Sequence, residues 1–265
     1  MNWVPPGAWL APGYAEWQAP AVLRGPVACL WARVIPASDD QPDDHLSLVL
    51  PDACSDLIWE QGVGAYVAGP DTGPVSTRTR PGTVFAGVRF RPAAGGQVLG
   101  LPLNELRDRR VPLAELRHDT ALGLPASPCL SPDLSPAEAA ARLLDVTGTL
   151  VASGRPDPAI SRAASLLRDP AARTDDIAER VGLSERQFRR RAHAAIGYGP
   201  KTLQRILRFQ RFVRLLDASP PPPDLATLAA VTGYADQPHL TRECVALSGL
   251  TPASLAGARR TADPG

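Results

Sequence analysis

The sequence contains few cysteines and no long hydrophobic run, and these absences exclude several classes of protein. Its 4 cysteines lie far apart, at positions 29, 54, 129 and 244, and match no zinc-binding spacing. No stretch approaches the roughly 18 consecutive apolar residues that a membrane-spanning helix requires. The N-terminal MNWVPPGAWLAPG lacks the basic segment and apolar core of a secretory signal. We therefore expect a cytoplasmic protein without a membrane partner.

The residues with which enzymes commonly bind metals or attack substrates are also scarce. The N-terminal half contains only His45 and His118, far apart in the sequence, whereas a histidine-based metal site needs several ligands in one pocket. The sequence shows no phosphate-binding glycine loop, no paired-histidine motif and no Ser/His/Asp arrangement. We expect no metal, no cofactor and no catalytic residue.

The basic residues are almost all arginine, since Lys201 is the only lysine among 28. From residue 156 onward, 16 basic side chains face 11 acidic ones, a net charge of +5. Residues 1–155 carry 12 basic and 16 acidic side chains, a net charge of −4. A basic C-terminal half fits a polyanionic partner, which the acidic half would repel.

A short pattern occurs twice near the C-terminal end. Each copy has a polar residue, an apolar residue four positions later, a glycine at thirteen and a proline at sixteen. The copies are Gly182-Leu-Ser184, Phe188, Gly197-Tyr-Gly-Pro200 and Gly233-Tyr-Ala-Asp236, Leu240, Gly249-Leu-Thr-Pro252. A repeat at fixed spacing marks a duplicated structural unit. The turn and cap residues predict a helix-turn-helix in each copy.

Helix start and stop signals support this interpretation in the first copy. Thr174, followed by two carboxylates, is expected to cap a helix that Gly182 ends in the left-handed conformation. Ser184 and Gln187 form a capping box that begins the next helix. The apolar stripe of that helix consists of Phe188, Ala192, Ala195 and Ile196.

The second copy repeats the design, and a longer helix joins the two. Asp224 and Gly233 bound a short helix, and Asp236 caps the next, whose buried stripe is Leu240, Cys244 and Leu247. Residues 200–217 predict a connecting helix, apolar on one side and basic on the other. Ser219 and the four prolines that follow are expected to end it.

These residues resemble the AraC/XylS family of transcription regulators. The stretches that carry the resemblance are IAERVGLSERQFRRR (177–191), GYGPKTLQRILRFQR (197–211) and GYADQPHLTREC (233–244). The resemblance covers residues 157–257 and implies an all-α DNA-binding domain of two helix-turn-helix units joined by a long helix. The family usually has Phe where this chain has Ala192 and Cys244, so local packing is expected to differ there.

The resemblance also implies which side chains contact DNA. The two recognition helices would read major-groove segments about one DNA turn (~34 Å) apart. Arginine suits guanine, and glutamine suits adenine. Arg205 is expected to meet a phosphate or solvent rather than a base. The predicted contacts are Arg186, Gln187, Arg189, Arg190, Gln237, His239, Thr241, Arg242 and Arg205.

Short strands dominate the N-terminal half, which predicts a small β-barrel or sandwich. The strands are expected at 27–35, 46–50, 56–59, 64–69 and 83–90. Helices are expected at 97–108 and 111–117, and Ser135 with Glu138 forms a capping box for a helix to about residue 151. Residues 123–136 are the expected hinge.

This half resembles the β-rich sensor domains of AraC-type regulators, with residues 51–59 and 87–108 resembling one poorly characterised domain. The likeness to cupin barrels is architectural and transfers no ligand. We interpret the chain as an α+β protein with a sensor domain at 1–152 and a DNA-binding domain at 153–265. Trp59 and Arg89 are weak candidates for holding an aromatic or anionic ligand.

The function that fits best is a sequence-specific DNA-binding transcription regulator, not an enzyme. Double-stranded DNA is the expected partner, with RNA polymerase, a small-molecule effector and a second copy of the chain as further candidates. Two alternatives stay open: a DNA-associated enzyme with a catalytic N-terminal half, and a helical module that binds protein. The operator, the effector and the direction of regulation are not encoded in any motif.

Overall fold

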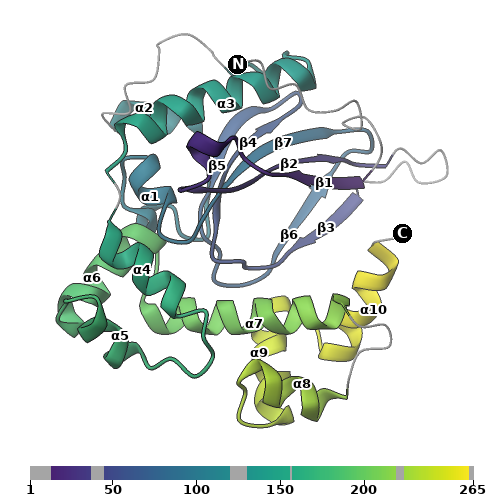
Figure 1. The fold of residues 1–265 in the computed structure, drawn as a ribbon. Coiled ribbons are helices and arrows are strands. Elements are labelled where there is room, and N and C mark those ends of the chain that lie inside the picture. The colour runs from purple at the N-terminus through teal and green to yellow at the C-terminus, as the bar shows by residue number, and fades with distance from the viewer. Residues whose placement is uncertain (1–12, 37–44, 120–129, 156, 219–223, 263–265) are drawn as a thin grey trace.

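The computed structural model describes residues 13–36, 45–119, 130–155, 157–218 and 224–262 (Figure 1). A β-rich N-terminal part is followed by a helical C-terminal part, which confirms the predicted α+β class. Ser219 and the prolines after it lie outside the described residues, as do residues 123–129 of the expected hinge at 123–136.

The N-terminal part is built on a six-stranded antiparallel sheet in the order β1-β2-β7-β4-β5-β8. All five predicted strands are present, and β1, β6 and β8 are additional. The six strands are β1 (Gly13–Trp17), β2 (Val27–Val34), β7 (Val84–Phe90), β4 (Ser55–Glu60), β5 (Gly64–Ala68) and β8 (Arg110–Pro112). A separate two-stranded sheet pairs β3 (His45–Val49) with β6 (Val75–Thr79).

One face of the six-stranded sheet packs against a long helix, α3 (Pro136–Ser153) (Figure 1). Ser135 and Glu138 form the predicted capping box that begins this helix. Alternate residues of β7 and β4 point into the core beneath α3, because side chains along a strand alternate between its faces. The opposite face carries Phe85 and Arg89.

The predicted helix at 97–108 is wrong for most of its length. The chain forms only the single turn α1 (Gly95–Val98) and a 3₁₀ turn at Leu103–Glu105. Between them Gly100 adopts a φ of +65° and Pro102 removes a backbone donor, so a continuous helix cannot form. The helix predicted at 111–117 begins later, as α2 (Leu113–Asp119), because Val111 pairs with Val67 in the sheet.

The C-terminal part consists of seven helices in the described residues. This part begins with α4, which is followed by the first helix-turn-helix pair, α5 and α6. The connecting helix α7 leads to the second pair, α8 and α9, and α10 comes last. Their bounds are α4 (Pro158–Leu166), α5 (Thr174–Arg180), α6 (Glu185–Ile196), α7 (Pro200–Ala218), α8 (Leu225–Thr232), α9 (Gln237–Ser248) and α10 (Pro252–Ala262).

The predicted turn chemistry holds with one exception. Gly182, Gly197, Gly233 and Gly249 all have positive φ, as the repeat requires. Thr174 does not cap α5: it is the first helical residue, and Arg173 occupies the capping position without a side-chain hydrogen bond. The two acidic residues after Thr174 still lie in the first turn, where they favour the helix dipole.

The predicted apolar stripes of α6, α7 and α9 are buried in one helical core. Phe209 and Phe212 of α7 are fully buried in the same core, with ring centroids 6.3 Å apart. Ala192 and Cys244, where the family usually has Phe, are also fully buried there. Phe209 and Phe212 therefore add aromatic volume to this core from the connecting helix, a contribution that our sequence interpretation missed.

The two parts of the chain pack against each other. Ala53 and Ala93, from loops of the β-rich part, belong to the helical core and both have positive φ. Gln210 of α7 donates from Nε2 to the carbonyl of Pro51 at 2.8 Å. Figure 1 shows α7 running along the lower side of the β-rich part. Loops of the β-rich part therefore contact the helical part through both apolar packing and a hydrogen bond.

Candidate nucleic-acid interface

The first recognition helix, α6, is fixed at its start by the predicted capping box. The Ser184 hydroxyl accepts from the Gln187 amide, and the Gln187 side-chain oxygen accepts from the Ser184 amide at 3.0 Å. The side chain of Gln187 is therefore partly committed to the cap. No hydrogen bond to another described residue engages its Nε2.

Opposite its buried stripe, α6 presents an arginine-rich face. Arg186, Arg189 and Arg190 are all exposed, and no hydrogen bond or ion pair to another described residue engages their guanidinium groups. Unpaired guanidinium groups on one helix face can bind phosphates or guanine edges without first breaking an internal contact. The structure thus brings together the three arginines that the sequence predicted.

The second recognition helix, α9, begins at Asp236, whose carboxylate accepts from the His239 amide at 2.7 Å. Pro238 sits in the first turn, where no intrahelical N–H bond is lost. Gln237 and Arg242 are exposed, whereas Thr241 is partly covered.

His239 is less available than its neighbours on α9. Its Nδ1 accepts from the Ala235 amide at 3.4 Å, and its ring meets the edge of the Tyr234 ring with centroids 5.2 Å apart. The imidazole therefore stabilises the turn before α9, and Nε2 is its remaining polar atom.

Arg205, on the connecting helix, is exposed, but its guanidinium is paired with another side chain of the protein. Its Nε and Nη2 donate to the two carboxylate oxygens of Glu243 at 2.8 and 3.0 Å. The hydrogen bonds to Glu243 raise the pKa of Arg205. Next along the helix, the Arg208 guanidinium lies over the Tyr234 ring, 5.4 Å from its centroid. Both arginines thus join α7 to the second unit.

A second ion pair of the same form lies in the first unit. Arg191 of α6 donates from Nε and Nη2 to Asp157 at 2.7 and 2.5 Å. Asp157 also caps α4. Sequence reasoning missed Arg191, Asp157 and Glu243. The sequence feature that could have indicated Arg191 and Glu243 is their equivalent position in the repeat. They stand seven residues after Ser184 and Asp236, respectively.

The C-terminal half of α6 faces the β-rich part. A Cβ on Gly197 would lie 2.5 Å from Pro70 Cγ, and one on Gly96 would lie 3.0 Å from the Ala194 carbonyl. Partial burial lowers the pKa of His193, and the charges of Arg189 and Arg107 lower it further. The first half of α6, which bears the arginines, lies outside this contact.

The structure does not bring Trp59 and Arg89 together. Trp59 is fully buried beneath α3 and donates from Nε1 to the Ser131 carbonyl at 2.8 Å. Arg89 lies on the other face of the sheet, where its Nε is 3.1 Å from Asp56. The two residues therefore do not line one site.

Arg89 belongs to a partly buried charge cluster on that face of the sheet. Its guanidinium also lies 3.4 Å from Asp52 and 3.3 Å from Glu16. The Trp31 indole donates to Asp56 at 2.6 Å. Burial raises the pKa of Asp56 to about 6, against the opposing charge of Arg89. These contacts satisfy the guanidinium internally.

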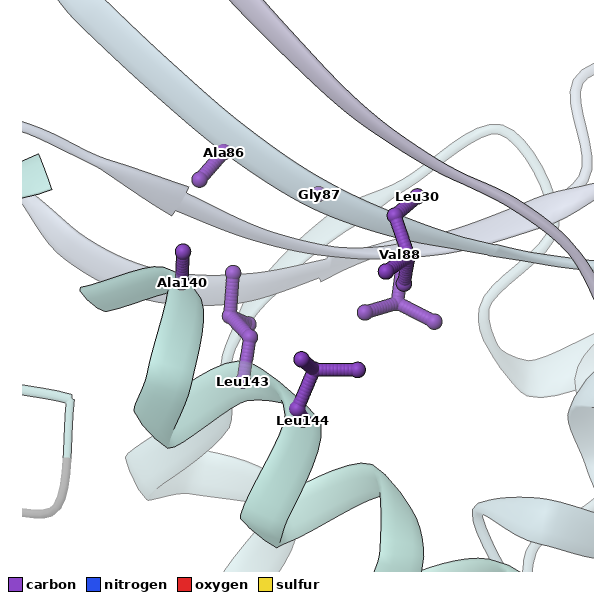
Figure 2. Close-up of a pocket in the computed structure, with 7 residues that line it drawn as sticks. All are labelled: Leu30, Ala86, Gly87, Val88, Ala140, Leu143 and Leu144. Atoms are coloured by element: carbon purple, nitrogen blue, oxygen red, sulfur yellow. The ribbon is translucent and has the colours of Figure 1, made fainter. Parts of the chain in front are cut away.

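Figure 2 shows an apolar pocket between the sheet and α3. It leaves about 10 Å³ of space for a water molecule, which is close to the minimum that one water needs. This pocket is too small for an effector. Its lining residues are Leu30, Ala86, Gly87, Val88, Ala140, Leu143 and Leu144.

The described residues contain neither a metal-binding cluster nor a membrane-spanning helix. No group of three or more His, Cys, Asp or Glu side chains among them is arranged to hold a metal ion. No helix formed by them has both the length and the apolar character needed to cross a membrane.

Comparison with known proteins separates the two parts of the chain. Residues 177–257 match the model of a helix-turn-helix domain, and residues 15–112 match a domain of unknown function (DUF6597). No curated protein sequence matches the chain.

Among solved structures, the chain is similar to ToxT from Vibrio cholerae. One such structure shares 10% identity, with a TM-score of 0.47 over 89% of this chain and 99% of that one. Another, ToxT from strain O395 bound to (E)-4-(8-methylnaphthalen-1-yl)but-3-enoic acid, shares 10% identity, with a TM-score of 0.45 over 86% and 98%. A third, ToxT bound to an unsaturated fatty acid, shares 9% identity, with a TM-score of 0.39 over 83% and 97%.

Proposed function

We propose that this chain, whose residues 177–257 form a helix-turn-helix domain of the AraC type, is a sequence-specific DNA-binding transcription regulator. In this proposal α6 and α9 read neighbouring major-groove segments. Arg186, Arg189 and Arg190 supply the contacts of the first helix. Gln237 and Arg242 supply the main contacts of the second.

The observation that carries the proposal is the pair of exposed arginines at equivalent positions of the two copies. Arg190 and Arg242 each stand six residues after the helix cap, and neither is engaged by another described residue. The neighbouring position, by contrast, carries an ion pair in both copies. Both copies thus leave the sixth residue after the cap exposed and pair the seventh, as expected of two helices that bind the same kind of surface.

Gln187, His239 and Thr241 are proposed as secondary contacts. Each is partly covered or engaged in its own helix cap, so each can offer only its remaining polar atoms. We expect their replacement to have smaller effects than that of Arg190 or Arg242.

The proposal assigns residues 1–152 to a regulatory domain and 153–265 to DNA binding, without catalytic residues in either. An effector bound to the first would act through the contacts of Pro51 and Pro70 with α7 and the turn after α6. A homodimer and a contact with RNA polymerase remain predictions about surfaces outside these helices.

Base preference measured on selected duplexes tests the proposal. The full chain is used to select its preferred DNA, and Arg190→Ala and Arg242→Ala are then compared on duplexes with single base changes. Each variant is expected to lose preference at one base pair, in its own half-site, by about 5- to 150-fold, the range of one bidentate guanine contact.

The matched control is Arg142→Ala, which removes the same charge from the exposed side of α3. It should leave both affinity and base preference unchanged. If Arg190→Ala and Arg242→Ala behave like this control, the two helices do not read DNA. Duplex binding that collapses with added salt would argue against the protein-binding alternative, because phosphate contacts weaken with salt.

A further inference from the structure

The two recognition helices are each tied to another helix at the same register position. Seven residues after the cap, α6 carries Arg191 and α9 carries Glu243. Arg191 pairs with Asp157 at the start of α4, and Glu243 pairs with Arg205 of α7. In both units the partner comes from the helix that precedes the helix-turn-helix pair.

The two ion pairs share their geometry. They differ in which residue the recognition helix supplies, an arginine in the first and a carboxylate in the second. Both use the Nε and Nη2 edge of the guanidinium against two carboxylate oxygens, at 2.7 and 2.5 Å in the first and 2.8 and 3.0 Å in the second. Two parallel hydrogen bonds restrict rotation as well as distance. Such a pair therefore fixes the angle at which a recognition helix leaves its support.

The carboxylates in these pairs are well covered. The side chains of Asp157 and Glu243 are 21% and 16% exposed, whereas those of Arg191 and Arg205 are 35% and 44% exposed. Removing an arginine would thus leave a partly buried carboxylate without its partner. A partly buried unpaired charge is costly, so the helix is expected to shift.

A second contact reinforces the tie in the second unit. The Arg208 guanidinium covers the Tyr234 ring, and the Tyr234 ring meets His239 in the first turn of α9. Two successive arginines on one side of α7 therefore hold the start and the middle of α9. Neither is presented as an open phosphate-binding group.

We propose that Arg205 and Glu243 are positioning residues for the second recognition helix, with Asp157 and Arg191 as their counterpart in the first. Arg205 then acts through Glu243 on the angle of α9, instead of binding a phosphate as the sequence suggested. This inference rests on the proposed DNA-binding function. Each ion pair would then control recognition of one half-site of the bound DNA.

The experiment measures binding of the full chain to its selected duplex and to duplexes altered in one half-site. Arg205→Ala and Glu243→Gln should each reduce preference in the second half-site by roughly threefold or more and leave the first unaffected. Combining them should add little to either alone. The reversed pair, Arg205→Glu with Glu243→Arg, should restore most of the preference. Asp157→Asn should act on the first half-site only.

Salt dependence separates positioning from phosphate contact. Loss of one phosphate contact flattens the slope of log K against log salt by about 0.9. Arg205→Ala should leave that slope unchanged. Glu243→Gln, which frees the guanidinium, should leave it unchanged or steeper.

Two outcomes overturn the inference on its own. One is a slope flattened by about 0.9 in Arg205→Ala together with an equal loss at all sequences. The other is failure of the reversed pair to recover half-site preference while its unfolding midpoint in urea matches the parent chain. A parent chain that binds no duplex overturns the proposed function as well, so the two failures are distinguishable.

Discussion

Gly197 provides a direct test of how the β-rich part meets the first recognition helix. It follows α6 with a φ of +96°, a region that costs an L-residue about 1–2 kcal/mol. A Cβ there would also lie 2.5 Å from Pro70 Cγ and 3.2 Å from the Leu103 carbonyl oxygen. Forcing a methyl group into packed surroundings costs about 1–3 kcal/mol more.

Gly182 and Gly249 are matched controls for the backbone cost. Both have positive φ, +71° and +73°, and end helices in the same repeat. A Cβ on Gly182 meets nothing within 4 Å, and one on Gly249 meets only Pro74, at an ordinary 3.9 Å. The excess cost of Gly197→Ala over these two substitutions therefore measures the contact with Pro70 and Leu103.

Urea unfolding of the full chain provides the assay. Gly182→Ala and Gly249→Ala should each lower the free energy of unfolding by about 1 kcal/mol, since alanine also restricts the unfolded chain. Gly197→Ala should lower it by about 1–3 kcal/mol more, as a shift of midpoint at constant m-value. Equal costs at all three positions would refute the packing of α6 against the β-rich part.

Three further predictions concern the helical part. Ser184→Ala should lower the free energy of unfolding by about 1 kcal/mol through loss of the α6 cap, whereas an unchanged urea midpoint would contradict the capping box. Phe212→Ala should cost about 3–5 kcal/mol because the ring is fully buried, and a cost below that of the cap would show that the core does not depend on it. The lowered pKa of His193 means that the unfolded chain binds more protons as pH falls below about 6.5, so stability should decrease there. His193→Gln should remove that part of the pH dependence in urea titrations, and an identical pH profile would rule out the contribution.

The helical part was predictable because its signals are local. Caps, left-handed glycines and apolar stripes at helical spacing depend on residues a few positions apart, and the structure reproduces them from Gly182 to Gly249. The prediction that Thr174 caps α5 was wrong, because a residue that can cap a helix is also tolerated at the first helical position. Its neighbours decide which role it takes.

The β-rich part was less predictable because its features depend on distant residues. β1, β6 and β8 are short strands whose formation requires partners elsewhere in the sheet. The apolar residues at 97–108 mimic a helix, but Gly100 and Pro102 turn the chain so that the same residues fill the sheet core. Trp59 and Arg89 could not be placed relative to each other until the alternation of β4 and β7 was known.

In the candidate interface, too, local features were predictable from the sequence and long-range contacts were not. The exposure of Arg186, Arg190 and Arg242 follows from helical periodicity alone. The engagement of Arg205 does not, because its partner Glu243 is 38 positions away. Register within the repeat is the one sequence feature that relates Glu243 to Arg191, and it says nothing about which residue each one meets.

The most direct test of two recognition helices acting together is a hydroxyl-radical footprint of the full chain on its selected duplex. We predict two protected tracts on one face of the DNA, with centres about 10–10.5 base pairs apart. Arg190→Ala should weaken one tract and Arg242→Ala the other. A single protected tract, or two tracts that both variants weaken equally, would contradict the account.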